Sequence, residues 1–190
     1  MISCKPPSSN TIEWILDFIL TLNDNEKDQI NQLWRIEVLH PKKNYISYEY
    51  TDFIEIKNDH PLLWEFTDIQ CELYFTGHCE DKAKLFYDLY MTHKQVFGNY
   101  QCFNIWLGSG KDHSNSLPYS SGLLTQGSQI LMERYAACLK QNGLDYTIIG
   151  KRQPVYWDGA QFLPEKKVNI LLFEQAFIIA EGFSFIQIKE

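Results

Sequence analysis

Two hydrophobic periods alternate along this chain, and together they restrict it to folds that combine strands with helices. Trp34, Ile36 and Val38 alternate with Arg35 and Glu37, which is typical of a strand with one buried face. In other segments the apolar residues recur every three or four positions, which indicates amphipathic helices. The sequence therefore predicts an α+β fold, with about three main helices packed on one side of a mostly antiparallel sheet.

The predicted strands are short apolar or alternating runs bounded by turn residues. They are expected at residues 34–38, 45–56, 64–66, 69–75, 102–107, 144–149, 168–173, 176–180 and 183–188. Turns are expected at residues 41–44 and 181–182, and the change of phase at residues 67–68 predicts a bulge or a break. Asp158-Gly159 lies between the runs at residues 155–157 and 160–162 and predicts a hairpin. The sheet is thus expected to be a meander followed by C-terminal hairpins.

Three segments have helical periodicity. The first begins at Asn10, which forms a capping box with Glu13, and its apolar positions are Ile12, Ile15, Leu16, Ile19 and Leu20. The second runs from Glu80 to Gly98, and the third from about Ser128 to Gly143. The polar run at residues 23–31 is expected to form a short additional helix, and residues 108–122 to form an irregular loop.

One globular domain, residues 1–190, is the simplest organisation for a chain without an internal repeat or a linker-like segment. The hydrophobic fraction of 45% and the aromatic fraction of 15% exclude global disorder. The core is expected to contain Ile15, Ile19, Leu73, Phe75, Leu85, Leu89, Ile105, Leu131, Tyr135, Ile148, Leu172 and Ile179.

The charge balance is acidic, with 17 Lys and Arg against 24 Asp and Glu, a net charge of −7. A negative surface repels phosphate backbones, so no nucleic-acid partner is expected. The same charge suits a cationic protein partner, and it also serves solubility alone.

Five cysteines, Cys4, Cys71, Cys79, Cys102 and Cys138, form no C-x-x-C pair. Their odd number and wide spacing argue against a disulfide framework and a zinc ribbon. The first apolar stretch is interrupted by charges, so neither a signal peptide nor a membrane partner is expected. A cytoplasmic location is the resulting expectation.

Two apparent cofactor sites fail on spacing. Residues 108–111 read Gly-Ser-Gly-Lys but lack the preceding glycine and the following Ser or Thr of a phosphate-binding loop. His78, Cys79 and His93 resemble metal ligands, but a helix between them separates His93 from Cys79 by roughly 20 Å, too far for one ion bound at about 2 Å. We therefore expect no metal and no cofactor.

Three residues are weak catalytic candidates. Cys79 directly precedes a predicted helix, where the helix dipole lowers a thiol pKa, and His60 or His113 is a possible base for it. Asp52 interrupts the apolar face of a predicted strand, as a bulge, a protective edge charge or a functional carboxylate would. The alternative for Cys79 is an inert thiol at a strand end.

The leading functional hypothesis is an acidic domain that masks a basic protein, as the immunity proteins of bacterial toxins do. The contacts predicted for it are the acidic residues of the exposed sheet face, a polar loop and one aromatic residue, namely Glu49, Glu55, Glu72, Asp112, Tyr119 and Trp157. Charge complementarity accelerates such association, and aromatic anchors stabilise it.

Two other hypotheses remain open. A small enzyme would assemble its site from scattered residues such as Cys79, His113 and Asp52. A structural subunit of an assembly would instead expose a large apolar patch.

Overall fold

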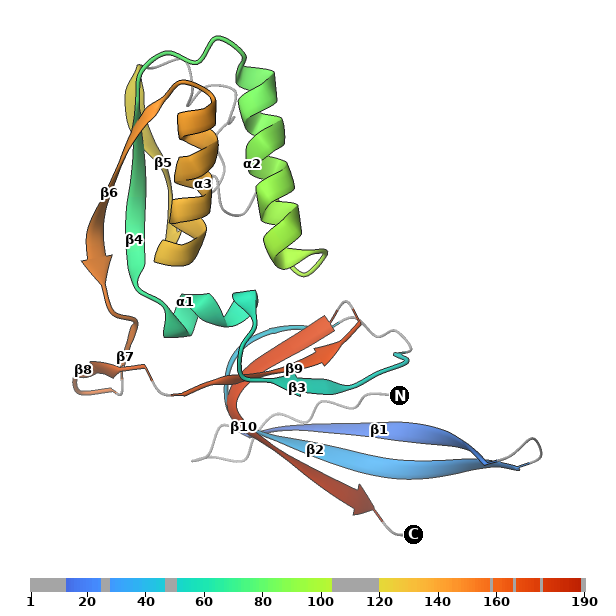
Figure 1. Cartoon of the computed structure of the whole chain (residues 1–190). Helices are drawn as coiled ribbons and strands as arrows, with labels where there is room; N and C mark the ends of the chain where they lie inside the picture. The colour runs from blue at the N-terminus through green and yellow to red at the C-terminus, as the bar shows by residue number, and fades with distance from the viewer. Residues whose placement is uncertain are drawn as a thin grey trace. The chain divides into compact units, whose positions relative to one another are not determined.

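A computed structural model describes residues 13–24, 28–46, 51–103, 120–157, 159–165, 167–174 and 176–188. The chain forms two compact units: unit 1 contains residues 1–59 and 167–190, and unit 2 contains residues 60–166 (Figure 1). The predicted α+β class with antiparallel sheets is confirmed. Whether residues 1–190 behave as one domain stays a prediction.

Unit 1 is built on one antiparallel sheet with the strand order β1-β2-β10-β9-β3. The strands are β1 (Glu13–Asp24), β2 (Asp28–Tyr45), β3 (Glu55–Lys57), β9 (Asn169–Phe173) and β10 (Ala176–Ile188). The predicted strand at residues 34–38 is the middle of β2, which is long enough to pair with both β1 and β10. The β9–β10 hairpin confirms one of the predicted C-terminal hairpins.

The helix predicted from Asn10 onward is wrong over the described residues, because Glu13–Asp24 form β1. Leu16 lies opposite Ile36 in the hairpin, and both side chains are buried. Apolar residues occupy both faces of β1, so their spacing also satisfies a helical period. The segment forms a strand and not a helix because it pairs with β2. In this strand Ile19, a predicted core residue, is 59% exposed.

The turns predicted in this sheet are also wrong. Pro41 lies within β2 opposite Ala180, where the β2–β10 register shifts, and proline is tolerated in strands at such irregularities. Residues 181–182 do not end a strand, because β10 continues from Ala176 to Ile188. The helix expected at residues 23–31 is replaced by the ends of β1 and β2.

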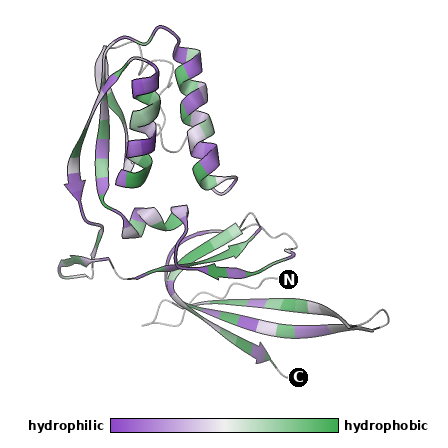
Figure 2. Ribbon diagram, viewed as in Figure 1, coloured by the Kyte–Doolittle hydropathy of each residue, from purple (hydrophilic) through white to green (hydrophobic). Residues whose placement is uncertain are grey.

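The core of unit 1 is built from four strands of its sheet. Buried side chains from β1, β2, β9 and β10 contact one another there: Leu16, Ile36, Val38, Leu171, Ile178 and Ala180. Figure 2 shows the hydrophobic residues that run along β1, β2 and β10. Burial of this alternating face stabilises the sheet by about 25 cal/mol per Å² of apolar surface.

Unit 2 packs helices on one face of a second antiparallel sheet, as predicted. The sheet has the order β5-β4-β6, formed by β4 (Gln70–Thr76), β5 (Ser121–Ser128) and β6 (Asp145–Arg152). α3 (Gln129–Gln141) packs on all three strands and α2 (Lys82–Phe97) packs on α3 (Figure 1). Local signals set both helix starts, since Asp81 and Ser128 accept hydrogen bonds from backbone amides of the first turns.

Three shorter elements complete unit 2. They are a 3₁₀ turn, η1 (Pro61–Leu63), the helix α1 (Trp64–Thr67), and a small hairpin of β7 (Val155–Trp157) and β8 (Phe162–Pro164). The strand predicted at residues 64–66 is therefore wrong: His60 caps the 3₁₀ turn through its Nδ1, and the chain continues into α1. The strand predicted at residues 102–107, including the predicted core residue Ile105, lies mostly outside the described residues.

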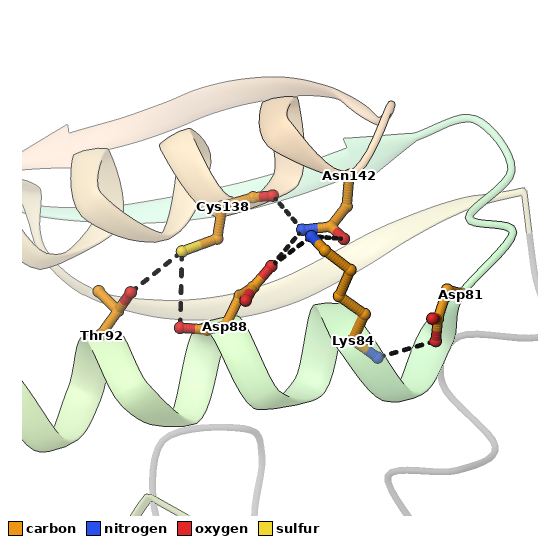
Figure 3. Close-up of polar contacts among 6 residues, drawn as sticks. All are labelled: Asp81, Lys84, Asp88, Thr92, Cys138 and Asn142. Carbon is orange, nitrogen blue, oxygen red and sulfur yellow. Dashed lines mark hydrogen bonds and ion pairs between the residues drawn. The ribbon is translucent and has the colours of Figure 1, made fainter.

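A polar cluster joins α2 to α3 (Figure 3). Asn142 donates through Nδ2 to the Asp88 carboxylate and to the Cys138 carbonyl, each at 2.9 Å. Lys84 donates to the same Asp88 oxygen at 2.9 Å, and Thr92 contacts the Cys138 sulfur at 3.1 Å. The hydrogen bond from Asn142, and then that from Lys84, lower the pKa of Asp88 below its ordinary value of 3.8.

We expect Asn142→Ala to reduce the free energy of unfolding by about 1 to 2 kcal/mol, because it removes the side-chain hydrogen bonds from Asn142 to the Asp88 carboxylate and the Cys138 carbonyl. The measurement is urea denaturation at pH 7, with Gln141→Ala, an exposed neighbour, as the control. The lowered pKa of Asp88 means that its contribution is present above its ordinary pKa and is lost as the pH falls through the folded value. Asn142→Ala should therefore also make unfolding less acid-sensitive, and an unchanged acid transition would contradict this.

Candidate functional site

The structure does not bring the catalytic candidates together within one unit of the part of the chain that it describes. Cys79 belongs to unit 2 and Asp52 to unit 1, whereas His113 lies outside the described residues. The Cys79 side chain is only 7% exposed, and a nucleophilic thiol needs access to its substrate. Asp52 is exposed in the segment before β3. These positions give no geometric support to a thiol–imidazole–carboxylate site.

The predicted acidic contacts are distributed between the two units. Glu55 lies on β3 of unit 1 and forms an ion pair with Lys57 at 2.9 Å. Glu72 lies on β4 of unit 2 and accepts a hydrogen bond from the Tyr74 hydroxyl at 3.1 Å, which raises the pKa of Tyr74. Predicted contacts Glu49, Asp112 and Tyr119 lie outside the described residues. Of the predicted contacts that the structure describes, Glu72 and Trp157 belong to unit 2 and Glu55 belongs to unit 1.

The most buried titratable pair has an internal structural role. His93 and Tyr135 are 2% and 0% exposed, and the His93 Nδ1 lies 2.7 Å from the Tyr135 hydroxyl. The His93 Nε2 lies 3.0 Å from the Gln101 carbonyl. Because a carbonyl only accepts, Nε2 carries the proton, and Nδ1 accepts from Tyr135. Burial lowers the pKa of His93, and hydrogen bonds within unit 2 occupy both of its ring nitrogens.

The strongest candidate site is the β7–β8 hairpin, which contains the predicted contact Trp157. The strands pair Val155 with Pro164 and Trp157 with Phe162, so these four side chains share one face. Val155, Trp157 and Phe162 are 53%, 56% and 69% exposed, and Pro164 is exposed as well. This group of four residues is called the apolar hairpin face below.

Local geometry holds the two large rings of the apolar hairpin face together. The Trp157 and Phe162 ring centroids lie 5.0 Å apart with an interplanar angle of 60°, the edge-to-face arrangement that aromatic pairs prefer. Gly159, with φ of 104°, provides the left-handed backbone of the turn between them. At the base, the Glu165 amide donates to the Pro154 carbonyl at 3.1 Å. The rings are therefore positioned before any partner binds.

The opposite face of the hairpin explains its orientation. Tyr156 and Leu163 are paired there and are only half-buried, so the hairpin places its smaller apolar area inward and its larger one outward. Burial would favour the reverse arrangement. An apolar face that remains exposed on a short, closed hairpin is typical of a binding surface.

The surroundings of the apolar hairpin face are more basic than the rest of the chain. Residues 151–167 contain four Lys and Arg but two Asp and Glu, and Lys151, Arg152 and Lys167 are exposed. In the chain as a whole, acidic residues exceed basic ones by seven. The sequence segment that contains the hairpin thus carries both apolar anchors and an excess of cations.

Comparison with protein-family models, with curated proteins and with solved structures finds no match to this chain. Among the described residues, no group of three or more His, Cys, Asp or Glu side chains could hold a metal ion. No helix in the described ranges is both long and apolar enough to cross a membrane.

Sequence reasoning identified Trp157 and the turn but missed Phe162, Val155 and Pro164 as contacts. The predicted second strand ended at residue 162, whereas β8 begins there. The missed signal is the pairing itself: aligning Trp157 with Phe162 across the turn places the apolar residues at 155, 157, 162 and 164 on one face. Neither strand alone shows whether that face is buried or exposed.

Proposed function

We propose that this chain is a protein-binding domain that anchors its partner on the apolar hairpin face. The observation that carries the proposal is the exposure of three large apolar side chains, 53% to 69%, on a single paired surface. Binding hot spots are enriched in aromatic residues that enter a pocket on the partner and exclude water. The fixed edge-to-face geometry of Trp157 and Phe162 also reduces the entropy lost on binding.

A protein partner suits this site better than a nucleic acid. Stacked bases need aromatic rings along a positively charged groove that follows the phosphates. The hairpin has rings and a few cations, but the chain carries a net charge of −7, which opposes a polyanion at longer range. Burial of the rings in an apolar protein pocket requires no such groove.

The immunity-type function extends this proposal to a basic partner. The support for it is the excess of acidic residues, 24 against 17, which would steer a cationic protein toward the domain. The local cations at residues 151–167 then require that the pocket for Trp157 itself be apolar or acidic. A basic protein with an apolar cleft would satisfy both conditions.

Site-specific photo-crosslinking tests the anchor. A photoreactive phenylalanine analogue is placed at Phe162 in the full chain, and the control carries it at Tyr87, a 61% exposed aromatic residue on α2. We expect one abundant adduct from position 162 in the source cell and none from position 87. The proposal would be contradicted by no adduct above the control level at position 162, or by the same adducts from both positions.

Salt dependence tests the charge of the partner. The partner identified by crosslinking is purified for this test. If it is basic, we expect the association rate to fall by about tenfold or more as ionic strength increases, because salt screens the long-range attraction between the two proteins. Stopped-flow tryptophan fluorescence can follow this association. A rate that is independent of salt would remove the immunity-type extension and leave the apolar anchor standing.

A structural subunit of an assembly is the second candidate, and one observation favours it. The β1, β2 and β10 strands of unit 1 expose several large apolar side chains, namely Ile19, Leu20, Leu39, Phe185 and Ile186. Exposed apolar side chains distinguish a subunit from a monomeric masking protein. These residues lie on both faces of the sheet near its edge strands, which favours association through an edge.

A further inference from the structure

The second half of β10 forms an edge of the unit 1 sheet. On one side, residues 182–188 pair with β2. On the other side, β9 pairs only with residues 176–180 of β10. No described strand pairs with this side of Phe183–Ile188, so the backbone groups there are available to another strand.

This edge lacks the usual protection against pairing with another chain. Edge strands normally carry a charge, a proline or a bulge that prevents such contacts. Residues 182–188 read Gly-Phe-Ser-Phe-Ile-Gln-Ile and contain neither charge nor proline. The register shift of β10 lies at Ile179/Ala180, before the segment begins. An unguarded extended edge is therefore presented over seven residues.

The opposite edge of the same sheet differs. β1 carries Asp17 in the middle of the strand, in a two-point ion pair with Arg35 of β2 at 2.8 and 3.0 Å. Acidic residues also stand at both of its ends, Glu13 and Asp24. Pairing β1 with a copy of itself would bring like charges together. Charges therefore oppose self-pairing of the β1 edge, whereas residues 182–188 of β10 carry no charge that would oppose it.

Apolar side chains lie on both faces of the β10 edge. Phe185 is 39% exposed and lies in a row with Ile36 and Leu16 across the sheet. Ile186, on the other face, is 43% exposed. A strand added to this edge would cover parts of both residues, so it would bury apolar surface in addition to forming backbone hydrogen bonds.

We propose that two copies of this chain associate by antiparallel pairing of their β10 edges. A two-fold axis brings the same surface of each copy together, so the surface that pairs must be complementary to itself. The β10 edge meets this condition because it is extended, apolar on both faces and uncharged, although the whole chain carries −7. Two copies can therefore meet here without placing charges of residues 182–188 opposite each other.

The proposal concerns unit 1 and goes beyond the anchor on the hairpin of unit 2. Its product is one sheet that continues across both copies, with the apolar row of Leu16, Ile36 and Phe185 extended by the same row of the second copy. Closed two-fold pairing uses the β10 edge of each copy once. It therefore limits the association to a dimer instead of a fibre.

Sedimentation equilibrium of the full chain, with two charge variants, tests this pairing. We expect the wild type to dimerise with a dissociation constant of about 10 µM or lower. Ile186→Lys should weaken the dimer by about tenfold or more, because it places two like charges at the new interface. Ile19→Lys, on the opposite edge strand and 59% exposed, is the matched control and should dimerise as the wild type does.

Amide hydrogen exchange supplies the second measurement. Edge pairing predicts that alternate amides within residues 183–188 become protected as protein concentration rises, and that Ile186→Lys removes this protection while retaining the wild-type circular dichroism. A wild type that stays monomeric, or a dimer equally disrupted by Ile19→Lys, would overturn the proposal. So would a dimer without protected amides, which indicates stacking of sheet faces. None of these outcomes affects crosslinking at Phe162, so the two proposals fail separately.

Discussion

Replacing Trp157 by alanine is expected to weaken binding of the partner by roughly 30-fold or more, the loss that defines a hot-spot residue. The expectation follows from the 56% exposure of the Trp157 side chain: it contributes little to the folded monomer and has a large area to bury in a complex. The measurement is isothermal titration calorimetry with the purified partner.

Phe162→Ala is expected to have a comparable effect, because Phe162 is the more exposed ring and lies 5.0 Å from Trp157. The effects of the two substitutions should not add, since removing either ring also releases the other from its fixed position. Tyr87→Ala, which removes an exposed aromatic residue from α2, serves as the control and should bind normally. If Trp157→Ala and Phe162→Ala both bind as tightly as Tyr87→Ala, the apolar hairpin face is not the anchor.

Tyr135→Ala is expected to lower the free energy of unfolding by about 3 to 5 kcal/mol, the range for removing a fully buried aromatic side chain. Tyr135 lies on α3 and is 0% exposed, and its hydroxyl is the donor to His93 of α2. Tyr135→Phe keeps the ring and removes only the donor, so a loss of about 1 to 3 kcal/mol is expected. Urea denaturation distinguishes the two, and equal losses would show that the hydroxyl contributes nothing separate.

The same pair predicts a pH dependence of stability. Burial lowers the pKa of His93 in the folded protein below its ordinary value of 6.5, so the unfolded chain binds a proton more readily. Stability should therefore be complete above pH 6.5 and should decrease as the pH falls below it. His93→Gln should reduce this dependence between about pH 5 and 7, whereas His78→Gln, at an exposed position, should not. An identical slope in both variants would contradict the assignment.

Where local chemistry dominates, the sequence was sufficient. α2 and α3 were predicted because their apolar residues recur at one helical period, and the structure shows that Asp81 and Ser128 cap their first turns. β4 was predicted because Cys71, Leu73 and Phe75 alternate with more exposed residues. The hairpin turn was predicted from Asp158-Gly159, although β8 begins later than expected. Each of these signals is contained within a few neighbouring residues.

The failures concern residues whose structure depends on distant partners. Apolar residues on both faces of β1 satisfy two periods equally, and the strand forms because β2 offers twelve paired positions. Residues 181–182 look like a turn, but the long β2 holds β10 in one extended strand across them. Pairing between strands far apart in sequence contributes hydrogen bonds and burial that no local window contains.

The candidate site shows the same division. The sequence by itself determined the α+β class, the two long helices, the negative charge and the presence of a hairpin that bears Trp157. The tertiary structure alone decided that Trp157 and Phe162 share an outward face and that β10 ends as an open edge. A side chain's exposure depends on which surface packs against its strand. The assembled sheet, and not the residues that are neighbours in sequence, determines which surface packs against the strand.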